Sequence, residues 1–189
     1  MKNRYGIDIW SDDNFFIEDG VVKVNYKPYP SLIKIVKDVR KQGFKGPLLL
    51  RFPHITKKQV KTLFNTFNAS IKEYDYKGKF NAVFPLKVNQ LPNFIHPLVS
   101  YGKKYNYGLE AGSKAELIIA MTYNNMGSPI TINGFKDKEM IHLCFIAKSM
   151  GHDITVIIEG LNELEMILEV LKETKMEAPN VGLRVRLHS

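Results

Sequence analysis

The chain has 189 residues, of which 44% are apolar and 24% are charged. This composition is typical of a globular protein and excludes a disordered or collagen-like chain. No apolar run reaches the roughly 18 residues that a membrane-spanning helix needs, so we expect no membrane association. Because Cys144 is the single cysteine, an internal disulfide bond is excluded and a cytoplasmic location is favoured.

The net charge of +8 raises the question of an anionic partner such as nucleic acid. The lysines are spread along predicted helix faces, and acidic residues are mixed with them in the later part of the chain. The densest region, residues 23–79, has neither an RNA-binding aromatic pattern nor zinc-finger spacing. We therefore predict a solvated surface and no nucleic-acid partner.

Residues 5–27 alternate in the manner of β-structure. Asp19-Gly20 between two apolar runs predicts a hairpin. From Pro30 onward the apolar period becomes that of a helix. We therefore divide the chain into residues 1–28, which supply strands of a small β-domain, and residues 29–189.

The first helix of the larger part follows Ser31 as its N-cap and ends near Gly43. Residues 47–52 form a short apolar run that indicates a strand. Thr56 and Gln59 make a capping box, which predicts the start of the next helix.

The apolar run 81–90 predicts a strand buried on both faces, as in a parallel sheet. It contains Lys87, and lysines are rarely buried without a partner. Desolvation would lower the pKa of a buried lysine and leave a neutral amine, the form that attacks a carbonyl group. The residues alone leave open the commoner alternative, in which Lys87 turns out to solvent where the strand ends.

Four more strands, alternating with four helices, are expected at residues 105–109, 129–133, 154–158 and 181–187. Alternating strands and helices predict a parallel sheet, either a closed barrel or an open doubly wound sheet. A glycine-rich phosphate fingerprint is missing from the sequence, which argues against the open dinucleotide-binding fold.

A polar residue stands near the end of each strand, as barrel active sites require. These residues are Lys87, Glu110, Asn133, Glu159 and Arg184. Five strands cannot close an eight-stranded barrel, and the last strand would leave an exposed edge. We therefore expect the chain to be the front part of a longer polypeptide.

Three motifs then resemble one family, the bacterial biosynthetic arginine decarboxylases. They are FPLKVNQ at 84–90, GLEAGSKAEL at 108–117 and NGFKD at 133–137. YGIDIW at 5–10 and GLRVRL at 182–187 are also similar, so the resemblance runs over essentially the whole chain.

The resemblance implies an α/β fold: a pyridoxal-phosphate-binding (β/α)8 TIM-type barrel, of which the first five strands are present, preceded by strands of a second β-domain. It implies that Lys87 is the catalytic lysine that binds pyridoxal 5'-phosphate, with Glu110 and Arg184 near the cofactor. The family converts L-arginine to agmatine and carbon dioxide in polyamine (putrescine and spermidine) biosynthesis, and it is magnesium-dependent (Mg2+).

Each of these residues has a second interpretation. Glu110 could serve the amino end of the helix that starts near Ser113, and Arg184 could pair with Glu110 or Glu159. Asn133 precedes a glycine, and Asn-Gly is also a common turn.

Family members continue well beyond residue 189, and the missing part would supply the phosphate cradle and most substrate contacts. The resemblance also implies a homodimer or higher homo-oligomer with a shared active site. We therefore expect these 189 residues to be inactive alone. Two alternatives remain: a barrel decarboxylase acting on ornithine, lysine or diaminopimelate, and a non-catalytic regulatory homologue.

Overall fold

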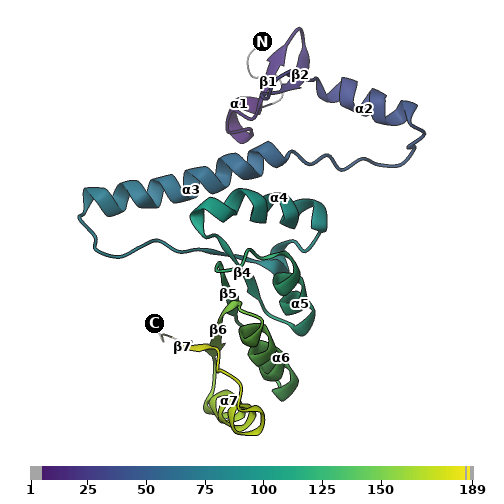
Figure 1. Cartoon of the computed structure of the whole chain (residues 1–189). Coiled ribbons are helices and arrows are strands. Elements are labelled where there is room, and N and C mark those ends of the chain that lie inside the picture. Colours follow the sequence, from purple (N-terminus) through teal and green to yellow (C-terminus); the bar gives the residue numbers. More distant parts are fainter. Residues whose placement is uncertain (1–5, 186, 188–189) are drawn as a thin grey trace. The chain divides into compact units, whose positions relative to one another are not determined.

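The computed structural model of the chain describes residues 6–185 and residue 187. The chain divides into two compact units, Met1–Ile55 and Thr56–Ser189. Figure 1 shows the elements of both units, and each unit is described by itself. The predicted division between residues 28 and 29 concerns membership of a second β-domain, and it stays a prediction.

The first unit contains the predicted hairpin. Strand β1 (Phe15–Glu18) pairs antiparallel with β2 (Val21–Val24). Asp19 and Gly20 between them both have positive φ, 51° and 75°, as in the tight turns that match the twist of paired strands. The hairpin prediction is confirmed.

The expectation of β-structure before this hairpin is wrong for part of the segment. Residues Ile7–Trp10 form the short helix α1, which follows Gly6 in the left-handed region at φ 61°. Ile7 is buried, whereas Ile9 is 83% exposed. Two apolar residues spaced two apart therefore did not define a strand, since no neighbouring strand pairs with them. Residue 5 lies outside the described part of the chain.

Helix α2 (Leu32–Lys41) begins where its cap predicts. The Ser31 hydroxyl accepts a hydrogen bond from the backbone N–H of Lys34 at 3.2 Å. The strand expected at residues 47–52 is wrong, because this segment has no regular structure and no strand partner. Helix α3 (Pro53–Glu73) starts three residues before the predicted capping box, with a proline in its first turn, where no N–H donor is needed.

The second unit is built on a parallel sheet whose strands lie side by side in sequence order. A helix follows each of the first four strands, so the predicted alternation is confirmed. The elements are β3 (Val83–Pro85), α4 (Pro92–Gly102), β4 (Gly108–Ala111), α5 (Lys114–Tyr123), β5 (Pro129–Ile132), α6 (Lys138–Ser149), β6 (Asp153–Ile158), α7 (Leu161–Thr174) and β7 (Asn180–Leu183).

Four of the five strands are shorter than the ranges predicted for them, and only β6 is not. The run at 81–90 is extended only over Val83–Pro85 and then turns into a 3-10 helix, η1 (Leu86–Val88). Residues Lys103–Tyr105 form a second 3-10 helix, η2, before β4. The last strand ends at Leu183, and residue 186 lies outside the description. Each strand extends only as far as a neighbouring strand pairs with it.

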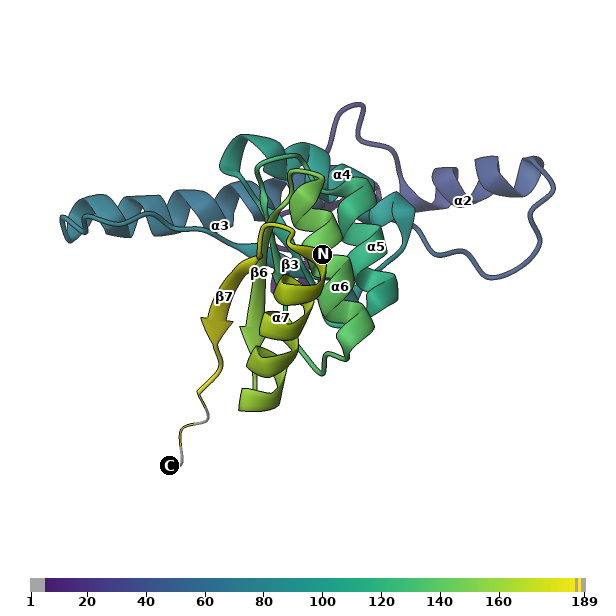
Figure 2. The same ribbon diagram turned by 60° about the horizontal axis from the view of Figure 1, so that its bottom comes forward.

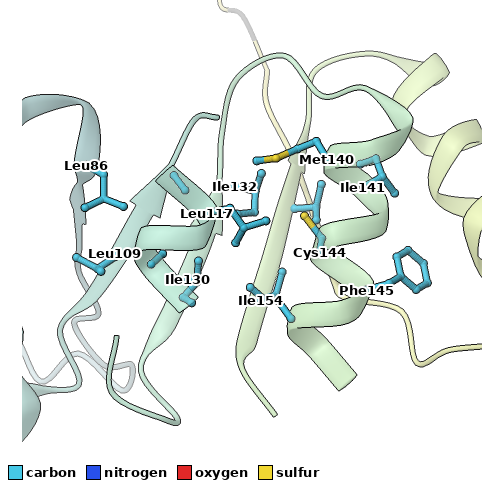
Figure 3. Packing of buried hydrophobic residues seen from close by; sticks show 14 of the residues in the cluster. Leu86, Leu109, Leu117, Ile130, Ile132, Met140, Ile141, Cys144, Phe145 and Ile154 are labelled. Atoms are coloured by element: carbon cyan, nitrogen blue, oxygen red, sulfur yellow. The ribbon is translucent and has the colours of Figure 1, made fainter. Parts of the chain in front are cut away.

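The core lies between the sheet and the helices that follow its strands. Figure 2 shows α5, α6 and α7 along one face of the sheet. Along β6 the buried residues alternate with half-buried ones, and Ile154, Val156 and Ile158 are buried. Cys144 of α6 is a core residue, since it belongs to the same buried cluster as Ile130 and Ile154 (Figure 3).

Strands β4 and β5 approach each other closely at Gly108. A Cβ atom at this position would lie 1.9 Å from the carbonyl oxygen of Pro129, so a side chain would force the two strands apart. The pairing then continues with Glu110 opposite Thr131. This register sets Glu110 beside the strand that ends just before Asn133.

Candidate active site

The polar residues predicted at the strand ends do lie along the carboxyl edge of the sheet. Lys87 follows β3 by two residues and Glu110 is the third residue of β4, whereas the other three each come directly after their strand. Those three are Asn133 after β5, Glu159 after β6 and Arg184 after β7. Parallel strands all end at one edge, so the topology brings these side chains to the same side of the sheet.

Lys87 is exposed, and it lies in η1 rather than in a strand. Of the two alternatives that the residues left open, the structure shows the commoner one, in which Lys87 turns out to solvent, because the strand ends at Pro85 and the chain turns. Within the described part of the chain, the Lys87 ammonium has no hydrogen-bond or ion-pair partner. Its amine is thus accessible to a ligand at the edge of the sheet.

Glu110 and Asn133 contact each other across β4 and β5. The Asn133 amide Nδ2 donates to Glu110 Oε2 at 3.4 Å, a long hydrogen bond. The Asn133 Oδ1 atom is buried and has no partner among the described residues. Pro85 pairs with Glu110 in the sheet, so the carboxylate also lies beside the end of β3. An unpaired buried acceptor beside a carboxylate can receive a hydrogen-bond donor from a ligand.

Arg184 pairs with a carboxylate of the neighbouring strand. Its Nη1 lies 3.0 Å from Glu159 Oε1, and its backbone N–H donates to the Ile158 carbonyl oxygen at 3.0 Å. One of the two predicted partners, Glu159, is thereby confirmed. The Arg184 side chain remains 49% exposed. It can therefore bind an anion without losing this pair.

Glu116 performs the helix-end role that was considered for Glu110. It is 8% exposed, and its Oε2 accepts from the backbone N–H of Gly112 at 2.7 Å. Its Oε1 accepts from the Gln90 side-chain amide at 2.8 Å. The Ser113 hydroxyl caps α5, whose predicted start near this residue is confirmed. The pattern Ser-x-x-Glu is a signal for this contact, although the carboxylate reaches one residue beyond the usual capping box.

Sequence reasoning missed a second buried carboxylate and the lysine that pairs with it. Lys136 is fully buried, and its Nζ lies 3.0 Å from Glu163 Oε2 and also donates to the Gly134 carbonyl oxygen. Glu163 is 4% exposed, and its Oε2 accepts from the backbone N–H of Glu159 at 2.8 Å. The only signal was that Lys136 falls within the NGFKD motif.

Side-chain contacts link each loop at this edge to the next one. The contacts are Gln90 with Glu116, Lys114 with Asp137 at 2.8 Å, Lys136 with Glu163, and Glu159 with Arg184. The hydrogen bond from the Lys114 ammonium holds the pKa of the Asp137 carboxyl below its ordinary value. The carboxyl edge is thus connected from β3 to β7 by polar contacts.

Two hollows of about 640 and 480 Å3 lie elsewhere, around η2 at the amino end of β4. Lysines line the larger one, among them Lys57, Lys61, Lys103 and Lys104. Neither hollow includes a residue of the polar row at the carboxyl edge. Among the described residues, no group of three or more histidine, cysteine or acidic side chains could hold a metal ion.

Comparison with known proteins gives a consistent result, although no protein-family model matches the chain. The chain is 40% identical over 193 residues to the biosynthetic arginine decarboxylase of Citrifermentans bemidjiense. This match covers 98% of the chain but only 30% of the relative. The chain therefore spans about a third of the length of the curated relatives that it matches.

Two solved structures also match nearly the whole of this chain, which covers about a third of each of them. The crystal structure of the biosynthetic arginine decarboxylase from Campylobacter jejuni is 60% identical with a TM-score of 0.95, over 98% of this chain and 31% of that one. Diaminopimelate decarboxylase from M. jannaschi shares the fold. It is 24% identical with a TM-score of 0.66, and the match covers 92% of this chain and 36% of that one. The predicted resemblance and the predicted fold class, the first five strands of a (β/α) barrel, are confirmed.

Proposed function

We propose that this chain is the amino-terminal part of a pyridoxal-phosphate-dependent arginine decarboxylase, which converts L-arginine to agmatine and carbon dioxide in polyamine biosynthesis. One observation carries the proposal. Lys87, which is exposed and has no partner among the described residues, stands at the carboxyl edge of the sheet, and the chain matches an arginine decarboxylase with a TM-score of 0.95. In barrels of this kind, chemistry takes place at that edge.

The residues at the edge fit pyridoxal phosphate. The cofactor has an aldehyde that a primary amine can bind and ring atoms that need polar partners. Lys87 offers an accessible amine, and the unpaired Asn133 Oδ1 offers an acceptor beside the Glu110 carboxylate. When bound, the cofactor supplies the electron sink for loss of the α-carboxylate.

The proposed roles of this chain's residues concern binding and proton transfer. Lys87 binds the cofactor through Nζ and must lose a proton to do so. Glu110 offers a carboxylate oxygen, Oε1, to a ligand at this edge, because the long hydrogen bond from Asn133 engages only Oε2. The carboxylate is the proposed acceptor for the proton released at Lys87 Nζ. Arg184, steadied by Glu159, provides a cation for an anionic group of the cofactor or substrate.

The proposal extends to a cytoplasmic homo-oligomer with a shared active site. No described residue is assigned to magnesium or to the guanidinium of arginine, since these contacts are expected in the remaining length of the polypeptide. Within the described part of the chain, none of the helices combines the length and the apolar character needed to cross a bilayer.

The test is borohydride reduction of the complete polypeptide in the presence of pyridoxal phosphate, followed by peptide mass mapping. We expect a pyridoxyl group on the peptide that contains Lys87. The Lys87→Arg variant keeps the positive charge but cannot form the linkage, so it should incorporate none. Its decarboxylation rate should fall by about 10²–10⁴-fold, the range for loss of a positioned acid–base group.

Turnover of arginine, ornithine, lysine and diaminopimelate by the complete polypeptide would then identify the substrate. Preference for any of the last three would replace the arginine assignment and keep the barrel chemistry. A folded polypeptide whose Lys87 stays unmodified would contradict the proposal and favour a non-catalytic homologue.

A further inference from the structure

One ion pair at the carboxyl edge differs from the others in the described structure, because both of its members are buried. The Lys136 side chain is 0% exposed and that of Glu163 is 5% exposed. By contrast, the Lys114–Asp137 and Lys138–Glu169 pairs are 38–54% exposed. We propose that Lys136 and Glu163 form a positioning pair, which holds the loops after β5 and β6 so that Asn133, Glu159 and Arg184 stay in place at the active site. For its activity readout this inference rests on the proposed function.

The surroundings of Lys136 explain why the pair must stay intact. Lys136 is fully buried, and its charge acts on the thiol of Cys144, which belongs to the apolar core. An ammonium ion there is tolerated only when an opposite charge and hydrogen bonds replace its water. Glu163 supplies the charge, and the Gly134 carbonyl supplies an acceptor.

Glu163 uses both carboxylate oxygens to bind backbone of the two loops. Its Oε1 accepts from the backbone N–H of Lys136 at 3.3 Å, and its Oε2 accepts from that of Glu159 at 2.8 Å. Glu159 lies between the last residue of β6 and Gly160, the N-cap residue of α7, so this carboxylate joins the end of β6 to the first turn of α7. One side chain thus fixes the loop after β5 and the loop after β6 together.

The held backbone atoms are adjacent to the active-site side chains. Gly134, which accepts from Lys136, follows Asn133, whose amide contacts Glu110. Glu159, whose N–H is held by Glu163, carries the carboxylate that pairs with Arg184. A shift of either loop would therefore move a strand-end group that the proposed chemistry needs, and small displacements of reacting groups reduce rates strongly.

If Lys136 and Glu163 contributed only to stability, replacing both by apolar residues would leave the activity unchanged. Replacing a buried ion pair by apolar residues of similar size often preserves or raises stability. The Lys136→Met/Glu163→Leu double variant fills the same space but cannot accept from the Glu159 N–H or donate to the Gly134 carbonyl. This double variant therefore distinguishes a pair that positions the two loops from a pair that only stabilises the fold.

The experiment uses the complete polypeptide and compares this double variant with wild type and with Lys138→Met. Lys138 belongs to α6 and forms exposed pairs with Glu169 and Glu173, so Lys138→Met is the matched control for loss of a lysine. The measurements are Tm, kcat and KM for L-arginine, and amide hydrogen exchange of the cofactor-free protein in peptides covering 132–137 and 158–163.

We expect the double variant to keep a Tm close to that of wild type, while kcat falls at least tenfold with a smaller change in KM. Exchange should accelerate at least tenfold in both peptides. Lys138→Met should leave all of these values within twofold. A double variant with wild-type Tm, kcat and exchange would overturn the inference, because the pair would then be replaceable packing.

If the double variant does not fold, the Glu163→Gln variant tests the inference, since it keeps the side-chain volume but only one of the two acceptor oxygens. Unchanged kcat together with unchanged exchange in both peptides of that variant would overturn the inference. If the wild-type polypeptide does not decarboxylate arginine, the proposed function fails, and the exchange measurements alone decide about the positioning pair.

Discussion

The loops that precede α5 and α7 are both held by a glutamate of the following helix, but the side chain that binds this glutamate is neutral in one loop and charged in the other. In both, a glutamate at the third helical position accepts a hydrogen bond from a backbone N–H four residues earlier, at 2.7 Å for Glu116 and 2.8 Å for Glu163. Both glutamates also bind a side chain from the preceding loop. The partner is the neutral amide of Gln90 in the first case and the ammonium of Lys136 in the second.

The difference follows from exposure. Gln90 lies on an exposed loop, where water can complete its hydrogen bonds, so a neutral contact is sufficient. Lys136 is enclosed, and its charge requires a carboxylate within contact distance. The same helix-end arrangement is thus a local cap at α5 and part of a buried ionic network at α7.

Removing either glutamate should lower the free energy of unfolding, and this is the largest effect that we expect. Glu163→Ala should cost about 3–5 kcal/mol, because it leaves the Lys136 charge buried without a partner. Glu116→Ala should cost about 1–3 kcal/mol, because it leaves only neutral groups, the Gly112 N–H and the Gln90 amide, without their acceptor. Denaturant unfolding of the complete polypeptide measures both. Equal costs would mean that the charge of Lys136 does not distinguish the two loops.

An effect of intermediate size is expected on stability at alkaline pH, through the thiol of Cys144. Burial raises the pKa of the Cys144 thiol from 9.0 to about 12, and the nearby Lys136 ammonium opposes this rise. The unfolded chain therefore releases this proton at lower pH than the folded chain does. Stability from the neutral thiol is complete below pH 9 and is lost as the pH rises toward 12.

The check on this pH effect is the difference in unfolding midpoint between wild type and Cys144→Ala from pH 8 to pH 11. The wild type should lose stability more steeply, and the background variant Lys136→Met should increase the difference. Parallel curves for wild type and Cys144→Ala would contradict the expected burial of the thiol.

The smallest effect is expected at the exposed pair that links the loops after β4 and β5. Lys114→Met removes contacts with Asp137 and Glu139, which water and salt already screen. We expect almost no change in the unfolding midpoint at 0.15 M salt. The pKa of the Asp137 carboxyl should return toward its ordinary value, which NMR titration of the side-chain carboxyl would detect. A large loss of stability would show that exposed and buried links contribute equally at this edge.

Short-range rules predicted the parts of the fold that depend on neighbouring residues. Asp19-Gly20 forms its hairpin turn, and Ser31 and Ser113 each cap the helix that was expected to start there. These contacts join residues only a few positions apart, so the residue types and their spacing are sufficient to predict them.

Strand boundaries depended on distant partners and were predicted less well. Residues 47–52 have a strand-like composition but no neighbouring strand, and the run at 81–90 is a strand only where β4 pairs with it. Pairing across the sheet, rather than local propensity, decides where each strand ends.

The sequence by itself determined the alternation of strands and helices, the resemblance to arginine decarboxylases and the row of polar residues from Lys87 to Arg184. Only the tertiary structure decided which of those side chains are exposed and which groups lie behind them. Lys136 and Glu163 are 27 positions apart, and the NGFKD motif that contains Lys136 does not indicate that either side chain is buried. Burial results from packing between distant segments, and it converts an ordinary lysine and glutamate into a pair that holds two loops of the proposed active site.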